Sequence, residues 1–143
     1  TLRTMNQSQH QLVDALQKHG ADIHACTDVT GFGLLGHLGE MLQGNKSITI
    51  QLWADRIPAH PGALDLLDQG QASSLAPANR DAWSLLEGPV QLSASPSQAS
   101  LELLVDPQTC GPLLVACTAA SAERLMAQDS AWIQVGIAGS GHG

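Results

Sequence analysis

The stretch TDVTGFGLLGHL, residues 27–38, decides how the first half of the chain is expected to fold. A short run at residues 23–26 precedes it, and apolar residues continue after it at helical spacing as far as Gly44. The glycines between these two segments are typical of a loop. The sequence therefore predicts a strand, a glycine-rich loop and a helix over residues 23–44.

Helical and strand patterns alternate along the rest of the chain. Helices are expected over residues 6–19, 63–69, 79–86 and 118–128. Strands are expected over residues 47–52, near Val90, and over residues 101–105, 113–117 and 133–138, and the continuous apolar run 113–117 is typical of a central strand. Asn79 and Thr118 are expected to cap the helices that they begin, and the small, polar residues 93–100 to form a loop. This interleaving predicts an α+β fold, with helices layered over a mixed β-sheet.

Composition and charge exclude several classes of protein. The 143 residues suffice for one domain, and 43% hydrophobic against 13% charged residues excludes a disordered tail. Six basic against 13 acidic residues give a net charge of −7, which argues against a nucleic-acid partner. No apolar run approaches the ~20 residues of a membrane helix, so no membrane partner is expected.

The cysteines indicate the cellular compartment. Cys26, Cys110 and Cys117 form an odd set without a CxxC pair. Neither a disulfide framework nor a four-thiolate zinc site is predicted from this pattern. The expected location is therefore the reducing cytoplasm.

Gly31, Gly33 and Gly36 spell GxGxxG after a predicted strand, and Asp55 lies near the end of the next one. This pattern is shared with dinucleotide-binding loops. Asp28 and two threonines, however, stand where that motif has strand residues leading straight into the turn. A bare carboxylate at this place would repel a pyrophosphate, which counts against the dinucleotide interpretation.

The Asp28 carboxylate favours phosphate binding if Mg²⁺ lies between the two groups, because magnesium bridges one or two carboxylates to substrate phosphates. We therefore predict that Asp28 is a metal ligand for a nucleoside triphosphate. The helix beginning near Gly33 would present free N–H groups to anionic oxygens. Spacing alone leaves an alternative open, in which Asp28, with Thr27 and Thr30 beside it, caps the helix or ties a turn.

Two segments resemble motifs of one enzyme family. Residues 27–38 read like the TDVTGFGLLGH motif of selenophosphate synthetase (selenide, water dikinase), and DPQTCG at residues 106–111 looks like its DPQTSGG segment. Asn79 falls where that family usually has an asparagine. The resemblance spans residues 1–138, and it implies a domain like the C-terminal domain of aminoimidazole ribonucleotide synthetase.

The resemblance implies part of an ATP- and Mg²⁺-dependent enzyme that makes selenophosphate from selenide, ATP and water, releasing AMP and phosphate. It implies Asp28 as the metal ligand. The loop residues implied to surround the nucleotide are Thr27, Thr30, Gly31 and Gly33. No catalytic residue is expected in this chain, because the family's catalytic cysteine or selenocysteine and lysine belong to an N-terminal half.

The start of the chain fits the same expectation. It begins at Thr1 without a methionine and opens directly into a helical pattern. We therefore expect a single domain over residues 1–143, the C-terminal half of a longer synthetase. In the family, the N-terminal half also supplies the main dimer interface, so its own N-terminal domain and a second copy are the expected protein partners.

The chain departs from the family pattern at two positions. Cys110 replaces the usual serine, and Pro112 replaces the second glycine of the SGG run. Proline lacks an N–H, so any substrate contact through that group would be weakened. The departure leaves open a non-catalytic module of a fusion protein, used for packing or dimerisation. Cys110 is expected to be an inert thiol, with a redox or selenium-handling role as the alternative. His37 is expected to be a hydrogen-bonded packing residue and Asp106 to fix its turn, with metal binding as the alternative for each.

Overall fold

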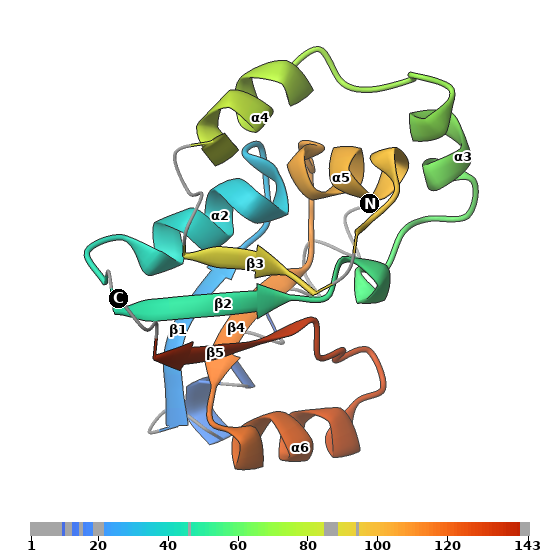
Figure 1. Ribbon diagram of the computed structural model, residues 1–143. Helices are drawn as coiled ribbons and strands as arrows, with labels where there is room; N and C mark the ends of the chain where they lie inside the picture. The colour runs from blue at the N-terminus through green and yellow to red at the C-terminus, as the bar shows by residue number, and fades with distance from the viewer. Residues whose placement is uncertain are drawn as a thin grey trace.

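The chain folds as helices around two small β-sheets (Figure 1). The computed structural model describes residues 10, 13–14, 16–18, 22–45, 47–84, 89–93 and 95–140. Both parallel and antiparallel pairings occur, so the predicted α+β class with mixed pairing is confirmed. No helix among these residues is long and apolar enough to cross a membrane.

The two sheets contain five strands between them in the described ranges. In the first sheet, β1 (Ile23–Asp28) pairs antiparallel with β4 (Leu113–Cys117), and Asp28 lies opposite Leu113. In the second sheet, β2 (Ile48–Leu52) lies between β3 (Val90–Leu92) and β5 (Gly136–Ser140). The β2–β3 pair is parallel and the β2–β5 pair is antiparallel.

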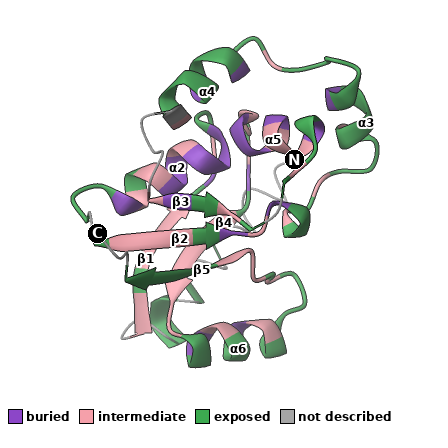
Figure 2. Ribbon diagram, in the orientation of Figure 1, coloured by how far each residue is buried: buried purple, intermediate pink, exposed green. Residues whose placement is uncertain are grey.

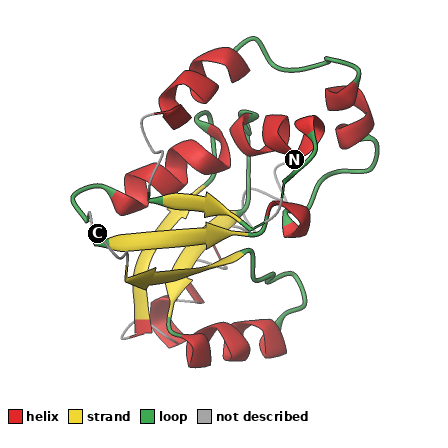
Figure 3. Cartoon of the chain, in the orientation of Figure 1, coloured by secondary structure: helices red, strands yellow, loops and turns green. Residues whose placement is uncertain are grey.

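The helices lie on two opposite sides of the second sheet (Figure 3). They are α2 (Gly33–Leu42), the 3₁₀ turn η2 (Ala54–Arg56), α3 (Ala63–Asp68), α4 (Ala76–Ser84), α5 (Gln98–Val105) and α6 (Ala119–Gln128). In the view of Figure 1, α2 to α5 gather above the second sheet and α6 lies below it. The Thr118 hydroxyl accepts a hydrogen bond from the Ser121 N–H at 3.4 Å, which confirms the predicted cap of α6.

The core forms where α2 packs against α4 and α5 (Figure 2). One face of α2 is buried through Leu34, Leu35, Leu38 and Leu42. These leucines join one cluster with Leu104 and Val105 of α5 and Leu52 of β2. Full burial of a leucine contributes about 1.5–3 kcal/mol, so this cluster fixes α2 and the loop before it.

The strand predicted over residues 101–105 is wrong, because these residues form the second half of α5. The Ser97 hydroxyl accepts a hydrogen bond from the Ser100 N–H at 3.1 Å, and this cap begins the helix inside the segment predicted as a loop. Leu101, Leu104 and Val105 then have the spacing of one helical face. A short apolar run does not by itself distinguish a strand from a buried helix.

Three other expectations need correction. Helix α4 begins at Ala76, so Asn79 lies inside the helix and does not cap it. The last strand is β5 at Gly136–Ser140, because only from Gly136 onward does the chain pair with β2. The run 113–117 was expected to be a central strand, but in the described part of the chain it pairs with β1 alone.

Two predicted helices extend beyond the described residues. Most of the helix expected over residues 6–19 lies outside them, although the Lys18 ammonium is described 2.8 Å from the Asp14 carboxylate. Residues 85–88, at the expected end of the helix over 79–86, also lie outside. The other predicted elements are confirmed, and the first strand extends beyond residue 26 to Asp28.

Candidate functional site

The loop after β1 is joined directly to the segment before β4. The Val29 N–H donates to the Pro112 carbonyl at 2.9 Å, and the Gln108 N–H donates to the Thr30 carbonyl at 3.0 Å. The two motifs that carry the family resemblance, residues 27–38 and 106–111, are therefore one structural unit. Pro112 takes part through its carbonyl, which proline retains, so its missing N–H does not open this junction.

Two glycines permit the close approach of these segments. A Cβ on Gly111 would lie 2.0 Å from the Val29 carbonyl oxygen. Gly33 has φ of +69°, and a Cβ there would lie 2.7 Å from the carbonyl carbon of Val105. Gly31 differs, because nothing lies within 4 Å of the Cβ position. Gly33 and Gly111 are thus required for packing, whereas Gly31 leaves open space beside the loop.

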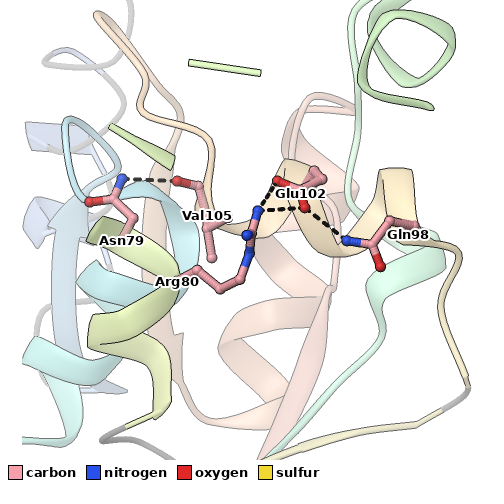
Figure 4. Close-up of polar contacts among 5 residues, drawn as sticks. All are labelled: Asn79, Arg80, Gln98, Glu102 and Val105. Atoms are coloured by element: carbon pink, nitrogen blue, oxygen red, sulfur yellow. Dashed lines mark hydrogen bonds and ion pairs between the residues drawn. The ribbon is translucent and has the colours of Figure 1, made fainter. Parts of the chain in front are cut away.

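Asn79 ties the loop to the end of α5, as Figure 4 shows in part. Its Nδ2 donates to the Gly31 carbonyl at 3.0 Å and to the Val105 carbonyl at 2.9 Å. Asn79 is buried, with 8% of its surface exposed. The carbonyls at the end of a helix lack partners within that helix, so this amide satisfies one of them. Sequence patterns suggested only a cap for Asn79, and the family resemblance marked its position without a role.

The next residue of α4, Arg80, fixes α4 to α5 through a buried carboxylate. Its Nη2 donates to both oxygens of Glu102, and Gln98 Nε2 donates to Glu102 Oε1 at 2.8 Å (Figure 4). Glu102 is only 8% exposed. Loss of Arg80 would leave a buried charge without its cation, which is strongly destabilising. This contact adds to the packing of α4 against α2 and α5, which holds Asn79 in place.

Asp28 is the last residue of β1 and is exposed. Among the described residues its carboxylate makes no hydrogen bond and no ion pair, and the Thr27 hydroxyl donates at 3.2 Å to its backbone carbonyl. Phe32 is the N-cap residue of α2, and among the described residues no side-chain hydrogen bond caps the N-terminal end of this helix. The alternative in which Asp28 caps the helix is therefore wrong.

A chain of hydrogen bonds runs from the loop into α2. Thr30 Oγ1 lies 3.1 Å from His37 Nε2, and His37 Nδ1 lies 2.9 Å from Glu40 Oε2. His37 is 7% exposed, and its ring centroid lies 5.7 Å from that of Phe32. The prediction that His37 is a hydrogen-bonded packing residue is confirmed.

A family model, described as AIR synthase related protein, C-terminal domain, matches residues 2–139. The chain belongs to this family. Several proteins named selenide, water dikinase are similar to this AIR synthase related domain. The one from Pelobacter propionicus is 41% identical over 105 residues, which cover 73% of the chain and 29% of that protein.

Two further relatives with the same name are similar to the chain. A selenide, water dikinase of Clostridium botulinum (strain Eklund 17B) is 38% identical over 109 residues, 76% of the chain and 30% of that protein. One from Agathobacter rectalis is 36% identical over 126 residues, 88% of the chain and 34% of that protein. The predicted resemblance is confirmed, and the chain spans about a third of the length of these relatives.

The sheet topology of this AIR synthase related domain rules out the dinucleotide interpretation. A dinucleotide-binding loop joins a strand to a helix inside a unit whose two strands are parallel neighbours. Here the strands before and after α2 lie in different sheets, because β1 pairs with β4 and β2 pairs with β3 and β5. Gly36 has a packing role, since a Cβ there would lie 2.5 Å from the Phe32 Cβ.

The oxygen donors around Asp28 fit a magnesium site that is completed by other ligands, such as substrate phosphates. They do not fit a site formed by this part of the chain alone. No three His, Cys, Asp or Glu side chains come together as a metal site within the described part of the chain. Asp28 supplies a carboxylate, and Thr27 and Thr30 supply hydroxyl oxygens nearby in sequence. Magnesium prefers oxygen ligands and is commonly held by one or two carboxylates together with substrate phosphates.

Asp106 follows α5 and belongs to the same junction. Its Oδ2 accepts a hydrogen bond from Gln108 Nε2 at 3.1 Å, which confirms the prediction that it fixes this turn. Burial raises the pKa of the Asp106 carboxyl, the Gln108 hydrogen bond opposes the rise, and the nearby charge of Glu102 adds to it. Ionisation of Asp106 is therefore less favourable in the folded chain than in the unfolded one.

This shift predicts a pH-dependent effect of Asp106→Asn. The penalty for the charged carboxyl is fully present above its folded-state pKa and disappears as the pH falls below the ordinary carboxyl range. Asparagine stays neutral and still accepts the Gln108 hydrogen bond. We expect a higher melting temperature than wild type at neutral pH, and a difference that closes in acid. A difference independent of pH would contradict the pKa direction.

Proposed function

We propose that this chain is the C-terminal domain of a selenide, water dikinase and helps to hold Mg²⁺ and ATP while selenophosphate is made. The overall reaction would take selenide, ATP and water and release AMP and phosphate. The observation that carries the proposal is Asp28, an exposed carboxylate without a hydrogen-bond or ion-pair partner in the described ranges, at the end of β1. The loop that follows it is held by backbone hydrogen bonds to residues 108 and 112. The similarity to proteins of that name supports the choice of reaction.

Each part of the loop has a distinct task in this proposal. Asp28 would hold Mg²⁺, which when bound supplies positive charge to the phosphate oxygens. Gly31 would leave room for the nucleotide, since nothing lies within 4 Å of its Cβ position. Helix α2 is ten residues long, and the dipole of this helix would stabilise the negatively charged phosphates at its N-terminal end.

The remaining machinery would come from the rest of the polypeptide. As the family resemblance implies, the catalytic cysteine or selenocysteine and the lysine would be supplied by an N-terminal domain. We propose that this domain faces the Asp28 loop and that the full enzyme is a cytoplasmic homodimer.

An assay of the polypeptide that contains this chain tests the proposal. Purified protein with Mg²⁺ and ATP should form AMP only when selenide is added, and ³¹P NMR should detect selenophosphate. The matched control omits selenide. Formation of neither product, with the protein folded and dimeric, would instead support a domain retained for packing.

The chain alone should fold but bind Mg²⁺–ATP weakly. One carboxylate and one glycine-containing loop offer only part of the contacts that a magnesium-bound triphosphate needs, and each tenfold loss of affinity corresponds to only about 1.4 kcal/mol. Calorimetry with the 143-residue chain should therefore give no submicromolar binding, and no AMP should form. Tight binding would mean that the chain carries a complete site.

A further inference from the structure

The hydrogen bonds of Thr30, His37 and Glu40 have a defined direction in the neutral imidazole. A carboxylate only accepts hydrogen bonds, so the contact between Glu40 Oε2 and His37 Nδ1 at 2.9 Å requires the proton on Nδ1. In the neutral ring, Nε2 is then an acceptor. The Thr30 hydroxyl, 3.1 Å from Nε2, must donate its own proton to the ring.

This direction determines what Thr30 can still do. A hydroxyl has one proton and two lone pairs. With its proton given to His37, Thr30 Oγ1 can only accept hydrogen bonds or bind a cation. It is thereby suited to a hydrated metal ion, whose water molecules are donors, and unsuited to donating a hydrogen bond to a phosphate oxygen.

Thr30 lies on the same side of the chain as Asp28. The antiparallel pairing of β1 with β4 continues past Asp28, because the Val29 N–H donates to the Pro112 carbonyl. Successive side chains of an extended segment alternate, and here the exposed Asp28 is followed by Val29, which is 2% exposed, and then by the half-buried Thr30. Alternation therefore places the Asp28 and Thr30 side chains on the same side of this segment, opposite the buried Val29.

We propose that Glu40 and His37 are positioning residues that hold Thr30 Oγ1 as an acceptor for the hydrated divalent cation of Asp28. The inference rests on the proposed function, since Asp28 is the metal ligand there. His37 is buried beside Phe32, with its two ring nitrogens on Thr30 and Glu40. Its effect passes through the direction of the Thr30 hydroxyl. The loop would thus offer two oxygen contacts to the cation, one charged and one neutral.

The tautomer of the His37 imidazole can be measured without any ligand. In ¹⁵N NMR spectra of the 143-residue chain in mildly alkaline buffer, Nδ1 should carry the proton and Nε2 should be unprotonated. Glu40→Gln should allow the other tautomer, because an amide offers both a donor and an acceptor. A proton on Nε2 in the wild-type chain would overturn the inference, since Thr30 would then accept from His37.

Mn²⁺ serves as a paramagnetic probe of the Mg²⁺ position and detects weak binding. It should broaden the amide signals nearest Asp28 and Thr30. Thr30→Val keeps the shape of the side chain and removes the hydroxyl, so we expect about five- to tenfold weaker binding, the loss of roughly one hydrogen bond. Thr30→Ser should restore it. Thr49→Val on β2 makes the same exchange in the other sheet and is the control.

The outcomes separate this inference from the proposed function. If Mn²⁺ broadens the Asp28 signals equally in wild type and a folded Thr30→Val chain, Asp28 remains the ligand and the role of Thr30 is wrong. If Mn²⁺ leaves the Asp28 signals of wild type unchanged, the proposed metal role of Asp28 fails, and the cation contact of Thr30 fails with it. If Thr30→Val does not fold, the comparison of Thr30→Ser with wild type decides, and weaker binding by the serine chain would contradict the inference.

Discussion

Asp28→Asn should abolish selenide-dependent AMP formation by the polypeptide that contains this chain and leave the stability of the domain unchanged. Phosphoryl transfer depends on neutralising the phosphates, and an amide in place of a metal-bound carboxylate removes one negative charge from the magnesium site. The wild-type carboxylate is exposed and makes no hydrogen bond or ion pair among the described residues. We therefore expect the free energy of unfolding to change by no more than about 0.5 kcal/mol.

The measurement compares turnover and melting temperature for two variants. Asp65→Asn, on the exposed face of α3, makes the same change of charge away from the loop and should keep wild-type turnover. Wild-type turnover by Asp28→Asn at limiting Mg²⁺ would remove Asp28 from the metal site. A large fall in melting temperature, with turnover restored on cooling, would assign Asp28 to folding.

Local sequence patterns predicted the part of the site that is built from adjacent residues. The order strand, loop and helix over residues 23–44 is confirmed, because the signals for it are spacing and glycine position within one stretch of chain. The same reasoning was wrong for residues 101–105. Their apolar run fits either a strand or a buried helix, and the Ser97 cap together with the packing of Leu104 decided the outcome.

Local sequence patterns did not predict the contacts between segments that are far apart in the chain. Asn79 bonds to the carbonyls of Gly31 and Val105, which lie 48 and 26 residues away. Glu102 was expected in a strand, and its pairing with Arg80 becomes possible only because α5 is a helix packed against α4. Whether a polar residue caps its own helix or bonds to a remote loop depends on which carbonyls the fold brings near it.

Gly111→Ala should destabilise the chain more than any exchange at an exposed glycine. The new Cβ would lie 2.0 Å from the Val29 carbonyl oxygen and 3.0 Å from the Val29 carbonyl carbon. These are backbone atoms that cannot rotate away, so the two segments must separate. We expect the free energy of unfolding to fall by about 3 kcal/mol or more. This value is at the upper end of the range for substitutions that overpack a core.

Urea denaturation with a matched variant measures this effect. Gly139→Ala on β5 makes the same exchange where nothing lies within 4 Å of the new Cβ, and it should change stability by at most about 0.5 kcal/mol. The Val29 to Pro112 hydrogen bond holds the residue that follows Asp28, so separating the segments displaces the carboxylate as well. In the Gly111→Ala molecules that remain folded, Mn²⁺ should therefore no longer broaden the amide signals near Asp28. Equal stability of the two alanine variants would show that the motifs are not in close contact.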